Sequence, residues 1–185
     1  MTSPRLPLAF LITASAFALT GCSPEAAVPS APPSAEAEPL FASDEEALAA
    51  AEAAFEEYLV EAFAVFGADA GSPDRLEAVA TGQVLETDLA RADRYSTEGL
   101  RQAGKPEVLE TQLQQYIPGA NNDEVVTYSC LDGTSIELVD ATGASLSDPN
   151  RAATITVENT FEAGESGGLL LSRSEIWAEG ETCEF

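Results

Sequence analysis

Apolar residues recur along this chain with two different periods. From Ser43 to Gly67 they recur every three or four positions, which places them along one side of a helix. Ser43 and Glu46 have the spacing of a capping box, in which two side chains satisfy free backbone N–H groups at a helix start. A helix is therefore predicted over residues 43–66, with a buried stripe formed by Leu48, Ala51, Phe55, Tyr58, Leu59, Ala62, Phe63 and Phe66.

Two further helices are predicted after the first. Pro73 follows Ser72, and proline suits the first position of a helix because its missing N–H would have no partner there. Another helix is predicted from about Gln83 to Arg101, before the turn that begins at Gly104. The apolar side of this helix is predicted to consist of Leu85, Leu89, Ala92 and Ser96.

From Leu109 onward the apolar period changes to two, which is the period of a strand with one buried face. Asp132-Gly133 favours a tight hairpin leading into a short strand at 136–138. Short turns between alternating strands predict an antiparallel meander. Helices followed by strands indicate an α+β fold, in which we expect a curved antiparallel sheet to wrap around the first helix. The longer alternating segments are 109–117, 125–131, 154–161 and 169–177.

The first 21 residues have the pattern of a signal peptide. Arg5 gives a positive start, and the apolar segment 6–19 is too short for a bilayer-spanning helix, which needs about 20 apolar residues. The four residues Leu19-Thr20-Gly21-Cys22 resemble the lipobox of bacterial lipoproteins. This resemblance implies cleavage between Gly21 and Cys22 and a diacylglyceryl group on the Cys22 thiol, with acyl chains such as palmitate. The expected location is the extracytoplasmic face of the cell membrane, held by a lipid anchor.

Residues 22–42 are predicted to form a disordered tether between this anchor and the folded domain. The segment is rich in Pro, Ala, Ser and Glu, a composition that favours an extended chain over a packed one. The domain is therefore predicted to occupy residues 43–185. The prolines of the tether are Pro24, Pro29, Pro32, Pro33 and Pro39.

Charge and histidine content exclude several kinds of partner and site. The chain carries 32 acidic and 8 basic residues, a net charge of -24, and this repels nucleic acids and anionic lipid headgroups. It contains no histidine, which removes the usual general base near neutral pH and the commonest metal ligand. Asp132, Asp140 and Asp148 lack the spacing of an EF-hand calcium loop. No metal site, cofactor or nucleic-acid partner is expected.

The chain has three cysteines, and two of them are available for a disulfide if Cys22 carries the lipid. Cys130 and Cys183 then remain as an even pair, 53 residues apart, and an oxidising compartment favours a disulfide between them. The chain-entropy model gives such a bond about 4 kcal/mol as an upper figure. The alternative is two buried free thiols.

The segment after the tether resembles small alanine- and acid-rich lipoproteins of actinobacteria. The matching stretches are Asp44–Leu48, Tyr128–Asp132, Leu138–Asp140, Ser172–Trp177 and a cysteine near the C-terminus. The order of helices and strands also resembles the NTF2-like family, in which a curved sheet and helices form a cone around a pocket. That resemblance implies a pocket, whose candidate residues are Phe55, Tyr58, Tyr95, Tyr116, Tyr128 and Trp177.

The NTF2-like family includes isomerases and dehydratases as well as non-enzymatic binding modules. In its ketosteroid-isomerase-like members an Asp base and a Tyr donor act inside the cone, which makes Asp88 and Asp93 candidates here. No spacing identifies either acid as a base. Solvent-facing acids and packed tyrosines explain these residues equally well.

The expected function is that of a non-enzymatic, membrane-anchored lipoprotein that binds a small apolar ligand or an envelope protein. One alternative is an isomerase or dehydratase that uses Asp and Tyr inside the cone. Another is a structural docking module for cell-envelope machinery. The oligomeric state stays open, including a dimer through the open face of the sheet.

Overall fold

Helices occupy the first half of the folded chain and strands the second. The computed structural model describes residues 39–119, 123–180, 183 and 185, which belong to one compact unit, Glu36–Phe185. Its helical elements are α1 (Asp44–Phe66), the short 3-10 helix η1 (Pro73–Ala78) and α2 (Gly82–Glu98). This order confirms the predicted α+β fold. The strands are β1 (Arg101–Ala103), β2 (Glu107–Ile117), β3 (Glu124–Asp132), β4 (Glu137–Val139), β5 (Thr154–Ala163) and β6 (Leu169–Gly180).

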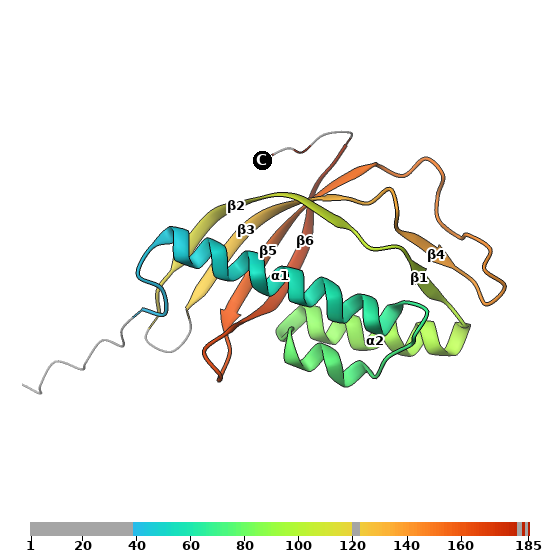
Figure 1. Cartoon of the computed structure of the whole chain (residues 1–185), viewed down its shortest axis with the longest axis horizontal. Helices are drawn as coiled ribbons and strands as arrows, with labels where there is room; N and C mark the ends of the chain where they lie inside the picture. The colour runs from blue at the N-terminus through green and yellow to red at the C-terminus, as the bar shows by residue number, and fades with distance from the viewer. Residues whose placement is uncertain (1–38, 120–122, 181–182, 184) are drawn as a thin grey trace, which may run out of the picture. The chain divides into compact units, whose positions relative to one another are not determined.

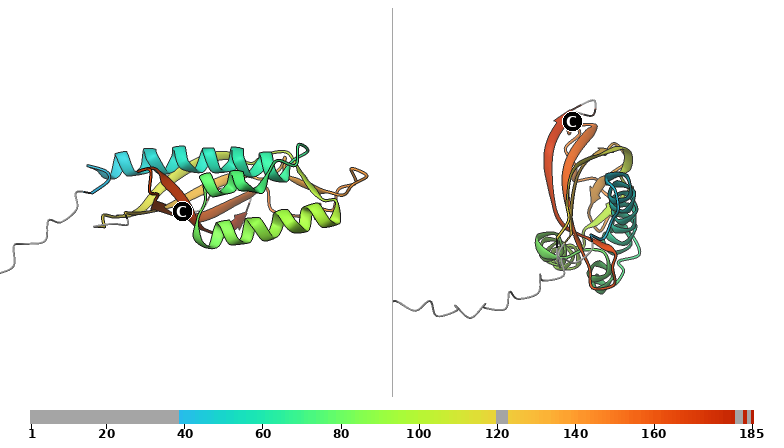
Figure 2. Two further views of the ribbon diagram at one scale, coloured as in Figure 1. Left: turned by 90° about the horizontal axis from the view of Figure 1, so that it is seen from below. Right: turned by 90° about the vertical axis from the view of Figure 1, so that its left-hand side faces the viewer.

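Four strands form the main antiparallel sheet, in the order β2-β3-β5-β6. α1 lies along one face of this sheet, and α2 contacts β6 (Figure 1). The strands bend around α1, as the end-on view in Figure 2 shows. Because β2, β3 and β6 all contact α1, the long first helix has the sheet as the partner that its apolar stripe requires.

The main core lies where the first half of α1 meets the centre of the sheet. Phe161 of β5 stands opposite Val125 of β3 and Leu171 of β6 in the strand register. Ala47 and Ala51 pack into the same cluster, and their small side chains let the helix approach the strands closely. Burying one side chain of the size of Phe161 contributes about 1.5–3 kcal/mol to folding. The predicted stripe on α1 is confirmed by the burial of Ala51, Phe55, Ala62 and Phe66.

The predicted hairpin after Asp132 is wrong. β4 pairs with β1 in a separate two-stranded sheet, whereas β3 pairs with β2 and β5. Asp132 Oδ1 accepts a hydrogen bond from the Thr134 backbone N–H at 2.7 Å, so the turn closes locally. Arg151 then donates to the carbonyl oxygens of Thr134 (3.0 Å) and Ile136 (2.6 Å). These bonds hold the segment away from the edge of β3, which β5 already occupies.

α2 ends earlier than predicted and presents a partly different side to the core. Gly99 adopts a left-handed conformation (φ 67°), which ends the helix at Glu98 and frees the following residues to form β1. The buried residues of α2 are Val84, Asp88 and Ala92, whereas Leu89 is 36% exposed. Of the predicted apolar side, Ala92 is buried and Leu85 packs against the core, whereas Leu89 and Ser96 are exposed. The buried row differs in part because it includes an acid, Asp88.

The folded part begins before Ser43, so the predicted tether 22–42 extends too far. The Leu40 N–H donates to Asp123 Oδ1 at 3.2 Å, and the Phe41 N–H donates to the Tyr116 hydroxyl at 3.1 Å. Tyr116 in turn donates to Asp123 Oδ1 at 2.7 Å, and its ring meets the Phe41 ring edge-on. We call these four residues the N-terminal latch. The predicted signal peptide, the lipobox with Cys22 and the rest of the tether lie outside the described residues.

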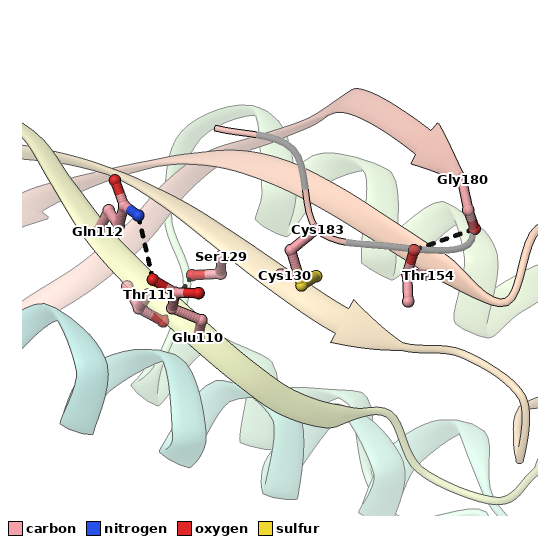
Figure 3. Close-up of a disulfide and its surroundings, with 8 residues drawn as sticks. All are labelled: Glu110, Thr111, Gln112, Ser129, Cys130, Thr154, Gly180 and Cys183. Atoms are coloured by element: carbon pink, nitrogen blue, oxygen red, sulfur yellow. Dashed lines mark hydrogen bonds between the residues drawn. A yellow bond between two sulfur atoms is a disulfide. The ribbon is translucent and has the colours of Figure 1, made fainter.

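The predicted disulfide is present. Cys130 on β3 is bonded to Cys183, and their Cα atoms are 5.6 Å apart (Figure 3). Cys130 is fully buried, and the bond fixes Cys183 to β3, an inner strand of the main sheet. Nearby, the Thr154 hydroxyl donates to the Gly180 carbonyl at 3.0 Å and holds the end of β6 to β5. None of the helices in the described part of the chain has the length and apolar character needed to cross a membrane.

Candidate functional site

A pocket of about 190 Å³ lies beside the second half of α1. We call it the α1 pocket. Most of its wall is apolar and comes from α1, the ends of β3 and β5, and the segment before β4. The sequence places these groups together because the apolar stripe of α1 continues to Phe66, past the part of the helix that packs in the main core. The apolar lining includes Phe55, Leu59, Ala62, Phe63, Phe66, Pro106, Leu131, Ile136 and Val157.

One side of the α1 pocket is polar, and two of its residues, Tyr58 and Arg91, contact a buried acid behind the wall, Asp88. The Tyr58 hydroxyl donates to Asp88 Oδ2 at 2.8 Å, and Arg91 Nη2 lies 3.1 Å from Asp88 Oδ1. Tyr58 comes from α1, whereas Asp88 and Arg91 stand three residues apart on α2, a spacing that places them side by side. The group therefore joins the two helices at the pocket wall.

The surroundings of this group determine its protonation. Asp88 is 1% exposed, and burial raises the pKa of its carboxyl, while Arg91 and the Tyr58 hydrogen bond act in the opposite direction. Burial also raises the pKa of the Tyr58 hydroxyl, and the negative charge of Asp88 adds to this effect. Both carboxylate oxygens of Asp88 have a partner. The arrangement is that of a paired structural acid at the edge of a pocket.

Arg91 is the cation of this wall. Its guanidinium carbon lies 4.8 Å from the centre of the Phe66 ring, which is within the range of a cation–π contact. A second hollow of about 170 Å³ lies beyond the same wall and shares Tyr58, Arg91 and Ser174 with the α1 pocket. Tyr58, Arg91 and Ser174 thus separate two adjoining hollows, and Asp88 lines the smaller one.

A row of hydrogen-bonded polar side chains crosses the helix-facing side of the sheet and ends at the α1 pocket. The Ser174 hydroxyl donates to Asn159 Oδ1 at 2.7 Å, and Asn159 Nδ2 donates to the Ser129 hydroxyl at 3.3 Å. The Ser129 and Thr111 hydroxyls are 3.1 Å apart. The row therefore links all four strands of the main sheet and fixes Ser174 in the pocket wall.

The predicted pocket residues separate into three places. Phe55 and Tyr58 line the α1 pocket as predicted. Tyr95 lies outside it and lines two other surface hollows, of about 440 and 220 Å³. Tyr116 belongs to the N-terminal latch at the other end of α1. Of the two candidate acids, Asp88 lines the adjoining hollow and contacts Tyr58 and Arg91 of the pocket wall, whereas Asp93 is exposed to solvent.

The other two predicted residues, Tyr128 and Trp177, lie on the opposite face of the sheet. Tyr128 alternates with Thr127 and Ser129, which are fully buried on the helix-facing side, so it points the other way. Trp177 sits at a bulge in β6 and is 57% exposed. Its ring centre is 5.0 Å from that of Tyr128. Their place in a pocket is therefore not supported, and the half-buried Tyr128 packs beside the exposed Trp177 instead.

Sequence reasoning missed Arg91, Gln102 and Phe63 as pocket residues. One usable signal was present for Arg91, because Asp88 and Arg91 form an opposite-charge pair three residues apart on a helix whose buried row includes the acid. Gln102 carries no such signal, since its position depends on β1 leaving the main sheet.

Two chemical properties follow from the residues that the structure describes. Among them, no group of three or more Cys, Asp or Glu side chains is arranged to hold a metal ion. The α1 pocket combines apolar walls with one cation and a few hydrogen-bonding groups, which is the usual composition of a small-molecule site.

Comparisons with known proteins add information about the fold. A scan against protein-family models and a search of curated proteins both gave no match. Among solved structures, 14 chains match. One is the crystal structure of the intermembrane space region of the chloroplast protein ARC6, with a TM-score of 0.53 and 16% sequence identity. The match covers 71% of this chain and 97% of the ARC6 region, and at this identity it concerns the fold alone.

Proposed function

We propose that this protein is a membrane-anchored extracytoplasmic lipoprotein whose domain binds a small, mostly apolar ligand without transforming it. The observation that carries the binding role is the α1 pocket, which joins an aromatic and aliphatic wall to a single charged residue. The proposed location rests on the lipobox-like residues Leu19-Thr20-Gly21-Cys22. An NTF2-like cone remains the interpretation of the fold that motivates a search for a ligand.

The volume of the pocket limits the size of the ligand. Pockets for drug-sized ligands measure about 300–1,000 Å³, whereas an apolar cavity of about 150 Å³ accommodates benzene. At about 190 Å³, the α1 pocket suits a single ring or a short branched chain with one polar group. The adjoining hollow behind Tyr58 gives a slightly longer ligand room only if that side chain moves.

The pairing of Asp88 supports a binding role over the isomerase alternative. A general base needs a carboxylate oxygen that is free to approach the proton of a substrate. Asp88 Oδ1 pairs with Arg91 and Oδ2 accepts from Tyr58, so each oxygen already has a partner at 3.1 Å or less. The hydroxyl of Tyr58 is likewise committed as a donor to Asp88.

Ligand binding is tested by blocking the pocket. Leu59→Trp would fill it, because Leu59 lines the wall, whereas Val60→Trp places the same ring at a neighbouring position that is 52% exposed. We expect toluene and benzyl alcohol to shift the NMR signals of pocket residues in the parent chain and in Val60→Trp, but not in Leu59→Trp. Equal shifts in both variants, or no shifts in the parent chain, would contradict the proposal.

The anchor is tested separately. Cys22→Ala removes the thiol that would carry the diacylglyceryl group. We expect the parent protein to fractionate with membranes and to incorporate a labelled fatty acid, and the variant to lose the label and stay uncleaved. A variant that remains membrane-bound and is processed normally would remove the basis for the lipoprotein assignment.

A docking role is the second candidate, favoured by two neighbouring exposed side chains of β6, Ile176 (62% exposed) and Trp177 (57% exposed). Trp177 packs on the half-buried Tyr128, on the face of the sheet opposite α1. Exposed large apolar side chains that lie together often mark protein contacts. A photo-crosslinking residue at position 177, compared with one at Val60, would test it in cells. A discrete adduct at position 177 alone would favour docking, and the same products at both positions would argue against it.

A further inference from the structure

Arg91 is the only charged residue among those that line the α1 pocket. Its ion pair with Asp88 uses one terminal nitrogen, Nη2. A guanidinium has five N–H donors, and in the described part of the chain Arg91 makes no side-chain hydrogen bond that would occupy the rest. The pocket therefore presents a cation with free donors to whatever enters it.

The other polar groups of the wall are oriented mainly as acceptors or weak donors. Tyr58 donates its proton to Asp88, and Ser174 donates its proton to Asn159, so both hydroxyls offer lone pairs to the pocket side. Gln102 uses one amide proton on the Gly104 carbonyl at 3.1 Å. The strong donor is thus concentrated at Arg91, which suits a ligand whose one polar group is an acceptor.

We infer that the α1 pocket binds small carboxylic acids, with a single ring or short branched body against Phe55, Leu59 and Phe63 and the carboxylate on Arg91. This inference rests on the proposed binding function of the pocket. A planar guanidinium matches a carboxylate through two parallel N–H···O bonds, which neutral acceptors such as alcohols cannot reproduce.

Asp88 opposes this binding but does not cancel it. A ligand carboxylate in contact with Arg91 lies closer to the guanidinium than to the acid on its other side, and Coulomb energy falls with distance. Attraction to the nearer charge therefore exceeds repulsion from the farther one. The net charge of the chain adds little at this range, because salt screens exposed charges beyond about 8 Å. Removing the charge of Asp88 should strengthen carboxylate binding.

Benzoate and benzyl alcohol are suitable probes, because they share a ring and differ in the charge of the polar group. We expect the Glu36–Phe185 unit at pH 7 to bind benzoate about tenfold more tightly than benzyl alcohol, as measured by NMR titration. Ligands of this size bind weakly, with a Kd of about 1 mM, so the titration must extend to high ligand concentration. Benzylammonium should bind more weakly than either.

Three variants separate the role of Arg91 from general effects. Arg91→Gln should reduce benzoate binding to the level of benzyl alcohol and leave benzyl alcohol binding unchanged. Arg94→Gln is the matched control, because it removes the same charge from the same helix at a residue outside the pocket lining, and should alter neither ligand. Asp88→Asn should bind benzoate several-fold more tightly than the parent chain, an effect that a purely structural role of Asp88 would not produce.

The outcomes distinguish the two proposals. If benzyl alcohol binds as well as benzoate, the pocket binds ligands but the carboxylate inference fails. If neither probe binds to a folded protein, the binding function itself fails. Should Arg91→Gln not fold because it leaves Asp88 buried without its partner, the double variant Asp88→Asn with Arg91→Gln removes both charges. That variant should also lose the preference for benzoate, and a retained preference would overturn the inference.

Discussion

Asp88 is a buried acid whose ionisation depends on the fold. Because burial raises its pKa above the ordinary value of 3.8, the folded chain holds this proton more tightly than the unfolded chain does. The stability that protonation contributes is fully present below the ordinary pKa of Asp and is lost as the pH rises through the raised value. The structure thus predicts that protonation of Asp88 makes the fold more stable as the pH falls.

The first prediction concerns Asp88→Asn, which cannot ionise. We expect the free energy of unfolding of the parent chain, relative to the variant, to increase as the pH falls from neutral towards 4. Urea denaturation at several pH values measures this difference. Asp93→Asn, at an exposed acid of the same helix, is the control. A relative loss of parent stability on acidification would mean that Arg91 outweighs burial at this site.

The second prediction concerns Thr127, whose hydroxyl is buried and has no hydrogen-bond partner among the described residues. Thr127→Val keeps the shape and removes the unsatisfied group, so it should stabilise the fold by about 1 kcal/mol. Ser129→Ala is the contrasting change, because Ser129 is bonded to both Thr111 and Asn159. It should destabilise by about 1–2 kcal/mol. Denaturation midpoints that move in the same direction for both variants would contradict this account.

At the scale of elements, two glycines with similar backbone conformations test the close contact between the end of β1 and Ser135. Gly104 (φ 75°) and Gly167 (φ 83°) both lie in the left-handed region, where a side chain costs about 1 kcal/mol. A Cβ at Gly104 would also overlap the Ser135 carbonyl, whereas at Gly167 no atom lies within 4 Å. We expect Gly104→Ala to destabilise by roughly 2–3 kcal/mol and Gly167→Ala by about 1 kcal/mol. Similar losses for both, measured by thermal denaturation, would show that the contact with Ser135 relaxes easily.

Helices and strands with a regular apolar period could be predicted from the sequence, but their pairing could not. The α1 stripe and the alternation of β5 from Val157 to Phe161 depend on local spacing, and both are observed. The predicted alternation of β6 is lost after Leu171, because two irregularities in its pairing with β5 shift the register. The departure of β4 from the main sheet depends on Arg151, which lies far along the chain from the carbonyl groups it binds. The buried side of α2 was predicted only in part, because the sequence does not distinguish a buried, paired acid such as Asp88 from a solvent-exposed one.

The candidate site was predictable to a similar extent. Phe55 and Tyr58 could be found because they belong to a long stripe on one helix. Tyr128 and Trp177 were misplaced because alternation shows that two residues share or differ in face, but not which face meets the helices. The position of Arg91 in the pocket needed the packing of α1 against α2, which no local pattern encodes.

At the scale of the whole domain, the disulfide joins residues 53 positions apart and closes a loop that contains β4, β5 and β6. Cys183→Ser should lower the free energy of unfolding by up to about 4 kcal/mol, because the unfolded chain regains the freedom of that loop. Cys183 is the better site to change, since Cys130 is fully buried and its replacement would also disturb the core. Urea denaturation of the variant and of the reduced parent chain should agree. A loss below about 1 kcal/mol would indicate that the C-terminal segment is held without the bond.

The N-terminal latch determines which contacts of the domain would break first under a pulling force. A pull on the chain ahead of Pro39 first loads two hydrogen bonds, from Leu40 to Asp123 and from Phe41 to Tyr116. We expect these two hydrogen bonds to break in sequence before the force acts on the first turn of α1. The helix has 23 residues and is about 34 Å long, and the α1 pocket lies beside its second half. A force applied to the domain through the proposed tether would therefore break contacts at the start of α1, while the α1 pocket beside the second half of the helix stays intact.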